Sequence, residues 1–274
     1  MLWGKYDLLI LDLDGVVYIG NKSVPHAIES LNSVASKVKI SAATNNASRS
    51  PEQVAKHLRE LGLQIQDADV VTSAQAGARL LASKVPADSQ VLVVGGIGID
   101  IAVKECGLNP IRATRNHESN GIIAAEVAGV IQGHGVDTSW WDLNTAALAI
   151  AKKKPWIATN RDLTVPTPHG LGPGNGGFVQ MLVNLSGQEP LVAGKPQPAL
   201  FVETIERMGA VSALVIGDRI DTDIEGANNC SIDSLLMLTG VHSLQDIPDH
   251  PAGKPTYVCE DLRCLLADAP PPRF

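Results

Sequence analysis

The stretch Tyr6-Asp7-Leu8-Leu9-Ile10-Leu11-Asp12 is a short apolar run that ends in an acidic residue. A continuous apolar run of this length is typical of a strand that is buried on both faces, as in a parallel sheet. Similar runs recur along the chain, mostly with segments of helical spacing between them. They lie at residues 37–45, 90–95, 125–132, 155–160, 191–194, 213–217, 231–238 and 256–259. The alternation predicts an α/β fold with parallel sheets covered by helices.

The number of expected strands is large for one sheet in a chain of 274 residues, so we expect two α/β parts. The spacing of apolar residues, with capping residues and glycine stops, predicts the helices. They lie at residues 25–35, 51–61, 99–106, 139–153, 177–185, 198–208 and 223–229. Residues 163–177 contain three Pro and five Gly and are expected to form a loop.

Composition excludes several classes of protein. The formal net charge of −7 argues against a nucleic-acid-binding surface, which is normally basic. The acidic residues Asp7, Asp12 and Asp14 interrupt the apolar N-terminal segment, so we expect no signal peptide. No apolar run approaches the ~18–20 residues of a membrane span. Four cysteines without a CxxC pair favour thiols in a reducing cytoplasm over a disulfide framework or a zinc site.

Polar side chains follow four of the expected strands. Asp12 and Asp14 follow the first, Thr44-Asn45-Asn46 the second, and Lys195 and Asp218 two later ones. Because ligands bind beyond the carboxyl ends of parallel strands, we expect these groups to share one edge of a sheet. Carboxylates without a nearby His or Cys favour Mg²⁺, which often shares its ligand shell with a substrate phosphate. The edge therefore predicts phosphate chemistry, with a carboxylate as nucleophile and a second as proton donor and acceptor.

The motif Asp12-Leu13-Asp14-Gly15-Val16 resembles the first motif, DxDG(T/V), of the haloacid dehalogenase-like (HAD-like) phosphohydrolases. Thr44, Lys195 and the acidic run from Asp218 to Asp223 stand in the order of the three remaining motifs of that family. The sequence is similar to the NagD-like/4-nitrophenylphosphatase branch over nearly the whole chain. The stretches that carry this similarity are Thr44-Asn45-Asn46, Ala158-Thr159-Asn160-Arg161-Asp162, Pro173-Gly174-Asn175-Gly176-Gly177 and Gly217-Asp218-Arg219-Ile220-Asp221-Thr222-Asp223.

The resemblance implies catalytic and metal-binding roles. Asp12 would be the nucleophile that forms an aspartyl-phosphate, and also a ligand of Mg²⁺. Asp14 would bind the metal through its backbone carbonyl, protonate the leaving alcohol and then activate the hydrolytic water. Asp218 would be a further metal ligand.

The resemblance also implies residues that hold the phosphoryl group. Thr44, with Asn45 and Asn46, would bind phosphoryl oxygens. Lys195 would neutralise charge on the nucleophile and on the phosphate, as both a catalytic and a substrate-binding residue. Asp223 would support the site by orienting Lys195 or a metal-bound water.

The family implies a Rossmann-like three-layer core with a parallel sheet and an inserted α/β cap of the C2 type. The core would comprise residues 1–74 and 190–274, and the cap residues 75–189. Hinges are expected in linkers near residues 73–76 and 185–190. The cap would exclude water from the phosphoenzyme and contact the leaving group.

The predicted function is a Mg²⁺-dependent phosphatase of the cytoplasm that hydrolyses small phosphate monoesters. Sugar phosphates, glycerol phosphate, phosphoglycolate and nucleotide monophosphates are all open as substrates. A dehalogenase is disfavoured because its first motif lacks the second aspartate, here Asp14. A phosphomutase, or a catalytically silent metabolite-binding or regulatory protein, remains an alternative.

Three further features have simpler interpretations. Gly95-Gly96-Ile97-Gly98 does not complete a dinucleotide-binding G-x-G-x-x-G motif, so we expect a structural turn. His134 and His169 are interpreted as polar loop residues, not metal ligands. Trp140-Trp141 are expected to serve packing or a dimer contact, and a homodimer through the cap is a hypothesis.

Overall fold

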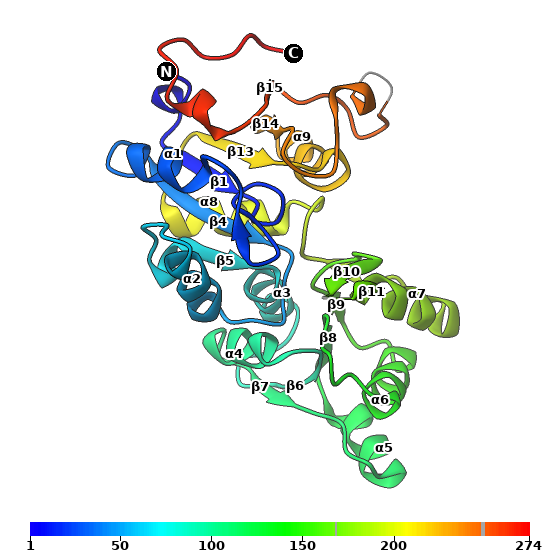
Figure 1. Ribbon diagram of the computed structural model, residues 1–274. Helices are drawn as coiled ribbons and strands as arrows, with labels where there is room; N and C mark the ends of the chain where they lie inside the picture. Colours follow the sequence, from blue (N-terminus) through cyan, green and yellow to red (C-terminus); the bar gives the residue numbers. More distant parts are fainter. Residues whose placement is uncertain (168, 248–249) are drawn as a thin grey trace. The chain divides into compact units, whose positions relative to one another are not determined.

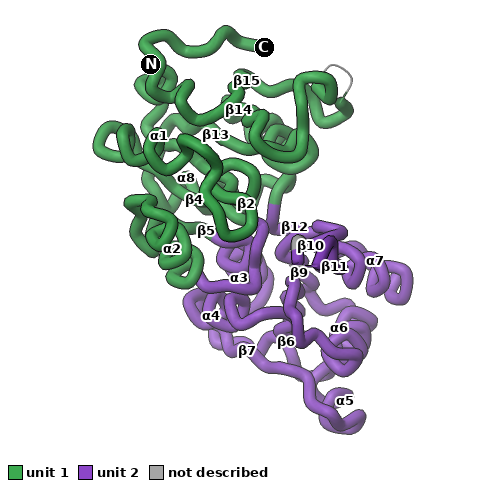
Figure 2. Tube along the Cα trace, viewed as in Figure 1, with its two compact units in different colours: residues 1–44, 51–71, 195–274 green, residues 45–50, 72–194 purple. Residues whose placement is uncertain are grey.

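The computed structural model describes residues 1–167, 169–247 and 250–274. The chain forms two compact units, which Figure 2 shows in different colours. Unit 1 contains Met1–Thr44, Pro51–Val71 and Lys195–Phe274, and unit 2 contains Asn45–Ser50 and Thr72–Gly194. The sequence prediction placed the inserted part at residues 75–189; that this part acts as a cap stays a prediction.

Unit 1 is built on a sheet in which β1 is central, between β13 and β4 (Figure 1). The order of the six strands is β15 (Tyr257–Cys259), β14 (Asp233–Met237), β13 (Ala213–Gly217), β1 (Leu8–Leu11), β4 (Lys39–Thr44) and β5 (Val70–Thr72). From β15 to β4 every neighbouring pair is parallel. The α/β class expected from the sequence is confirmed.

Short helices and turns surround the sheet of unit 1. The helices are α1 (Ala27–Val34), α2 (Pro51–Glu60), α8 (Ala199–Met208) and α9 (Glu225–Asn229). The helical turns are η1 (Trp3–Lys5), η2 (Asp67–Asp69), η3 (Ile220–Ile224), η4 (Leu244–Asp246) and η5 (Leu262–Leu265), and a hairpin joins β2 (Tyr18–Ile19) to β3 (Lys22–Ser23).

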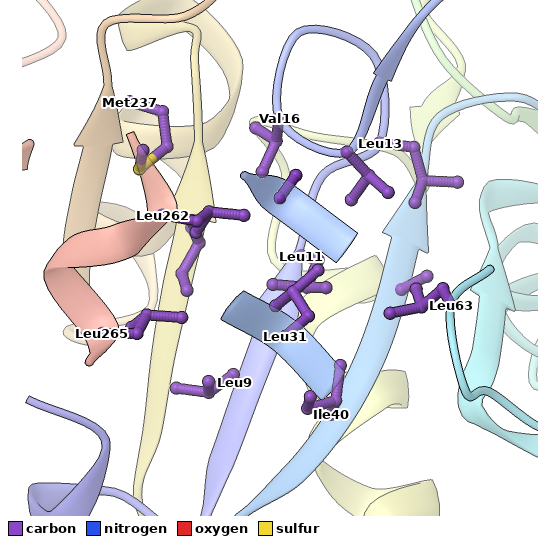
Figure 3. Close-up of a cluster of buried hydrophobic side chains, with 14 of the residues drawn as sticks. Leu9, Leu11, Leu13, Val16, Leu31, Ile40, Leu63, Met237, Leu262 and Leu265 are labelled. Atoms are coloured by element: carbon purple, nitrogen blue, oxygen red, sulfur yellow. The ribbon is translucent and has the colours of Figure 1, made fainter. Parts of the chain in front are cut away.

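The core of unit 1 holds β1 rigidly in the middle of the sheet. Leu9 and Leu11 point to one face because side chains alternate along a strand. Figure 3 shows them gathered with Leu31 of α1 and with Leu262 and Leu265 of η5, all fully or almost fully buried. Burial of each leucine contributes about 1.5–3 kcal/mol. The residues that follow β1 therefore start from a well-defined position.

Unit 2 contains a second parallel sheet, of five strands. Their order is β12 (Leu191–Val192), β9 (Trp156–Ala158), β8 (Gly129–Gln132), β6 (Gln90–Val94) and β7 (Asn109–Ile111). The helices are α3 (Ser73–Ala82), α4 (Ile97–Glu105), α5 (His117–Glu126), α6 (Trp140–Ala151) and α7 (Asn175–Ser186), and an antiparallel hairpin joins β10 (Thr164–Thr167) to β11 (Gly170–Pro173).

Local capping corrects two sequence-based expectations. Residues 73–76 are not a linker but the first turn of α3, because Thr72 and Gln75 form a reciprocal capping box there. Residues 125 and 126, expected at the start of a strand, end α5 instead; the Asn116 side chain begins this helix by accepting a hydrogen bond from the Ser119 N–H.

The proline- and glycine-rich segment 163–177 is also more regular than expected. Residues 164–167 and 170–173 pair as β10 and β11, and α7 begins at Asn175. Residue 168, which belongs to the expected loop, lies outside the described residues. The backbone pairing was not visible in the sequence because Pro and Gly obscure the alternation that marks a strand.

The turn at Gly95–Gly98 packs against the segment Asn45–Ser50 of the same unit. The Gly98 N–H donates to the Ser48 carbonyl (3.3 Å), and a Cβ atom at Gly98 would lie 2.5 Å from the Arg49 carbonyl oxygen. Residues 45–50 of the same chain thus cover the first turn of α4. This is the structural role that the sequence predicted for the turn.

Within the described ranges, no helix combines the length and the apolar character that crossing a membrane requires.

Candidate active site

The strand ends of unit 1 position the acidic residues. The Asp12 N–H donates to the Ile216 carbonyl (2.8 Å), so the ladder between β1 and β13 continues one residue beyond β1. Asp218 follows β13 directly. Because these strands are parallel neighbours, Asp12 and Asp218 leave the sheet at the same edge.

Lys195 joins two carboxylates at this edge, although the strand before it, β12, belongs to the sheet of unit 2 and not, as the sequence predicted, to the sheet of Asp12. Its Nζ lies 2.5 Å from Asp12 Oδ1 and 2.7 Å from Asp223 Oδ1. The Lys195 and Asp223 side chains are only 4% and 1% exposed. The second oxygen of Asp223, Oδ2, accepts a hydrogen bond from the Arg219 N–H (3.2 Å). Asp223 therefore holds Lys195 in place beside Asp12.

The charge of Lys195 is stabilised by its partners. Burial disfavours an ammonium group, but the carboxylates of Asp12 and Asp223 outweigh this effect and raise the pKa of Lys195 above its ordinary value. Lys195 is thus a permanent cation beside Asp12 at neutral pH.

One cation does not balance the carboxylates of this site. Oxygen atoms of Asp12, Asp218 and Asp223 all lie within 4.8 Å of one another. Burial, with the charge of Asp12, raises the pKa of Asp218 to about 6. Burial also raises the pKa of Asp223, with smaller contributions from Asp12 and Asp218 and with Lys195 opposing. The cluster lacks positive charge.

A divalent cation fits this deficit. Asp218 Oδ2 accepts the Val241 N–H (2.8 Å), whereas Asp218 Oδ1 is buried and has no hydrogen-bond partner among the described residues. Such an orphaned buried oxygen is costly unless a ligand satisfies it. An oxygen-only donor set suits Mg²⁺. Asp12 and Asp218 are the side chains that could hold the ion, since both oxygens of Asp223 have other partners.

Asp14 lies on a tight turn beyond Asp12. The Gly15 N–H donates to the Tyr18 carbonyl (2.8 Å), and Gly15 has a φ of +80°, a conformation that glycine adopts without strain. A Cβ atom at Gly15 would lie 2.5 Å from Asp218 Oδ2. The turn therefore needs glycine for two reasons, and it leaves the Asp14 side chain exposed.

The residues expected to bind the phosphoryl group, Thr44, Asn45 and Asn46, are divided between the two units. Thr44 is the buried last residue of β4, the strand beside β1 in unit 1. Asn45 and Asn46 belong to unit 2, where Asn45 Nδ2 lies 3.3 Å from Asp162 Oδ1 and Asn46 Oδ1 accepts the Ser48 N–H (2.9 Å). Phosphate binding by these three residues stays a prediction.

The sequence analysis missed residues that hydrogen-bond to Asp218 and to the turn at Gly15. Thr239, Val241 and His242 follow β14 and contact Asp218 or the turn at Gly15. The available signal was Thr239-Gly240 directly after an expected strand, the same kind of position that drew attention to Asp12 and Lys195.

Comparison with known proteins agrees with this geometry. A family model described as haloacid dehalogenase-like hydrolase matches residues 9–109, and a second HAD-like model matches residues 192–265. The D-glycerol 3-phosphate phosphatase of Mycobacterium tuberculosis is 44% identical over 266 residues, which cover 97% of this chain and 72% of that protein. The chain belongs to the HAD-like hydrolase family.

Other HAD-like relatives extend the comparison. An acid sugar phosphatase of Staphylococcus aureus is 32% identical over 96% of this chain and 98% of its own length. A crystal structure of the glycerol phosphate phosphatase of M. tuberculosis with magnesium superposes with a TM-score of 0.87, at 44% identity over 95% of this chain and 77% of that one. A 4-nitrophenylphosphatase of Thermotoga maritima superposes with a TM-score of 0.84, at 26% identity over 97% of this chain and 99% of that one.

These relatives and the carboxylate cluster confirm three predictions. The protein is a HAD-like enzyme of the NagD-like branch, it hydrolyses small phosphate monoesters, and its cofactor is Mg²⁺. The α/β fold is the Rossmann-like fold of this family.

Proposed function

We propose that this phosphatase transfers the phosphoryl group of its substrate first to Asp12 and then to water. In the first step an Asp12 oxygen bonds to phosphorus while the bond to the alcohol oxygen breaks, and Asp14 donates a proton to that oxygen. In the second step Asp14 takes a proton from water, whose oxygen bonds to phosphorus and releases phosphate from Asp12. The ion pair between Lys195 and Asp12 carries the proposal, because it places a fixed positive charge beside the nucleophile.

Mg²⁺ bound to Asp12, Asp218 and the Asp14 carbonyl would offset the charge of the phosphate dianion. Lys195 adds positive charge beside Asp12, and Asp223 keeps Lys195 oriented. The burial of Lys195 and Asp223 supports this role, since buried ion pairs hold one geometry. Because Asp14 is exposed, it is accessible to a leaving group that enters from solvent.

We propose that Thr44, with Asn45 and Asn46, binds phosphoryl oxygens. The position of Thr44 at the end of the strand beside β1 supports this assignment. Residues 1–74 and 190–274 would act as the catalytic core, and residues 75–189 as a cap that excludes water and contacts the leaving group. The separate compact unit at Thr72–Gly194 supports the cap assignment.

We propose that the substrate is a small polyol or sugar phosphate, with glycerol phosphate as the leading candidate. The activities of the relatives support this choice, since the relative at 44% identity is a D-glycerol 3-phosphate phosphatase and the one at 32% identity is an acid sugar phosphatase.

We also propose that the protein is cytoplasmic and forms a homodimer through unit 2. The four cysteines lie in the described part of the chain and are free thiols, which supports the reducing cytoplasm. A homodimer through unit 2 is supported by Trp140, which is 59% exposed and packs edge-on against Trp141 and His117. Sedimentation of the purified protein and of Trp140→Ser tests the dimer: a monomeric wild type contradicts it.

The test of function is phosphate release from a panel of metabolites, with 4-nitrophenyl phosphate as a general substrate. Glycerol phosphates and sugar phosphates are expected to be hydrolysed faster than phosphoglycolate and nucleoside monophosphates, and EDTA is expected to abolish release. Release that persists in EDTA contradicts the metal-dependent mechanism. Movement of phosphate within a sugar, with little release, indicates a phosphomutase instead.

A further inference from the structure

Residues 239–242 have no role in the reaction described so far, yet they touch both acidic motifs of the site. This segment, Thr239-Gly240-Val241-His242, follows β14. Among the described residues, its hydrogen bonds include Thr239 Oγ1 to the Gly15 carbonyl (2.6 Å), Val241 N–H to Asp218 Oδ2 (2.8 Å), His242 N–H to the Asp218 carbonyl (3.3 Å) and Ile220 N–H to His242 Nδ1 (3.1 Å).

The Val241 N–H determines which oxygen of Asp218 faces the cation position. A hydrogen bond from an amide to a carboxylate is charge-assisted and directional. It engages Oδ2, and the carbonyl of the same residue accepts the His242 N–H. Oδ1 is then left buried and without a partner among the described residues. The 239–242 segment thus leaves one defined oxygen of Asp218 available to a metal ion.

Gly240 lets the segment approach Asp218 this closely. A Cβ atom at Gly240 would overlap the Asp218 carboxylate. The overlap involves the short side chain of Asp218, which Val241 already holds, so the carboxylate would have to rotate or the segment retreat. Either change moves Oδ1.

Thr239 contacts the turn that carries Asp14 and Gly15. Its hydroxyl donates to the carbonyl of Gly15, the residue after Asp14. The carbonyl of Asp14 is the proposed backbone ligand of Mg²⁺, so the Thr239 hydroxyl restrains the turn that carries this ligand. His242 restrains the other motif, because its Nδ1 accepts the N–H of Ile220 at the start of η3.

We infer that Thr239 and Gly240 are positioning residues for Mg²⁺: the 239–242 segment sets the separation and direction of the Asp218 carboxylate and of the Asp14–Gly15 turn. This inference rests on the proposed function, in which Asp218 and Asp14 are metal ligands. Residues that orient metal ligands typically change metal affinity by about 10–100-fold when they are replaced.

The experiment measures Mg²⁺ binding to the metal-free protein by titration calorimetry, and separately the Mg²⁺ dependence of 4-nitrophenyl phosphate hydrolysis. Gly240→Ala is expected to raise the Mg²⁺ Kd by about tenfold or more, and Thr239→Val by about three- to tenfold. Thr239→Ser keeps the hydroxyl and is expected to restore wild-type affinity. At saturating Mg²⁺, kcat of Thr239→Val is expected to stay within about threefold of wild type, since the reacting groups are unchanged.

Gly4→Ala is the matched control for Gly240→Ala, because Gly4 lies in the same unit, is exposed and has no atom within 4 Å of a new Cβ. If Gly240→Ala does not fold, the Thr239→Val and Thr239→Ser pair decides. Wild-type Mg²⁺ affinity in Thr239→Val overturns the inference, and so does a loss of affinity that Thr239→Ser does not restore.

Asp218→Asn separates failure of this inference from failure of the proposed function. If Asp218→Asn loses Mg²⁺ binding while Thr239→Val keeps it, the metal site stands and the positioning role falls. If Asp218→Asn binds Mg²⁺ as tightly as wild type, the proposed metal site itself is wrong.

Discussion

The two units carry parallel sheets of similar design but opposite chemistry at the carboxyl ends of their strands. In unit 1, charged groups gather at this edge: Asp12 follows β1, Asp218 follows β13, and Lys195 lies between Asp12 and Asp223. In unit 2 buried neutral amides lie at the corresponding edge, such as Gln132 at the end of β8 and Asn160 just beyond β9, and the charged Lys195 that follows β12 turns to the carboxylates of unit 1.

The amides of unit 2 satisfy one another. Trp156 Nε1 donates to Gln132 Oε1 (3.2 Å), and Gln132 Nε2 donates to Asn175 Oδ1 (3.2 Å). Asn175 Nδ2 donates to the Asn160 carbonyl (2.8 Å), and Asn160 Nδ2 to the Asn45 carbonyl (2.8 Å). All but Asn45 are buried. A buried network of this kind stabilises one packing and carries no charge, although Thr159 Oγ1 beside it is buried without a partner among the described residues.

The edge of unit 1 differs in its charge. Three carboxylates face one ammonium group, and Asp218 Oδ1 has no partner among the described residues. Both parallel sheets present the carboxyl ends of their strands at one edge. The balance of charge and hydrogen bonds there decides whether the edge only stabilises the fold or can bind a metal ion and a substrate.

The largest effect is expected for Asp12→Asn. An amide cannot serve as the nucleophile, so kcat for 4-nitrophenyl phosphate is expected to fall by about a thousandfold or more. Unfolding should not become easier, because one negative charge leaves a crowded site. Steady-state kinetics and urea unfolding measure both. A variant that keeps a tenth of wild-type activity is incompatible with Asp12 as nucleophile.

Lys195→Met tests the charge balance of the unit 1 edge. The substitution keeps the length of the side chain but leaves the buried Asp223 and its neighbours without their cation, which is expected to cost about 3–5 kcal/mol of unfolding free energy. Urea unfolding measures this loss. Added Mg²⁺ is expected to recover part of it, and unchanged stability without Mg²⁺ would mean that Lys195 is not the neutralising group.

Gln132→Leu tests the opposite character of the unit 2 edge. It leaves the Trp156 N–H and the Asn175 side-chain oxygen without their partners, which is expected to lower the unfolding free energy by about 1–3 kcal/mol. Mg²⁺ affinity is expected not to change. Gln180→Leu, on the exposed face of α7, is the matched control and should cost little. If Gln132→Leu changes the Mg²⁺ affinity, the unit 2 edge does not have a purely structural role.

The pH dependence of stability tests the charge imbalance at the unit 1 edge of the metal-free protein. Burial and the charge of Asp12 raise the pKa of Asp218 to about 6 in the folded protein, from 3.8. Folded protein therefore holds this proton at pH values where unfolded protein has lost it, so the metal-free protein loses about 3 kcal/mol of stability as the pH rises from below about 4 to above about 6. Bound Mg²⁺ removes this penalty.

The measurable consequence is a larger Mg²⁺-induced increase of Tm at pH 7.5 than at pH 5. Asp218→Asn, which lacks this titration but keeps Asp223, should show a smaller loss of stability and no metal effect. An equal Mg²⁺ effect at both pH values contradicts the raised pKa of Asp218.

Much of the fold could be predicted because its signals are local. The apolar run before Asp12 and the capping pattern at Ser50-Pro51 each specify an element without distant contacts. Helix α5 was missed because its apolar residues, such as Ile122 and Ile123, do not fall on one helical face. The sequence also could not show that Asn45–Ser50 packs within unit 2, because this depends on its contact with Gly98, which is distant in the chain.

The sequence by itself determined which chemical groups follow each strand, Asp12 and Asp218 among them, because strand periodicity and strand ends are encoded by neighbouring residues. Only the tertiary structure decided how these groups are used. The Thr239 hydroxyl meets the Gly15 carbonyl across 224 positions of the chain, and the Val241 amide selects one oxygen of Asp218. Such contacts depend on the order of strands in the sheet, which no local pattern encodes.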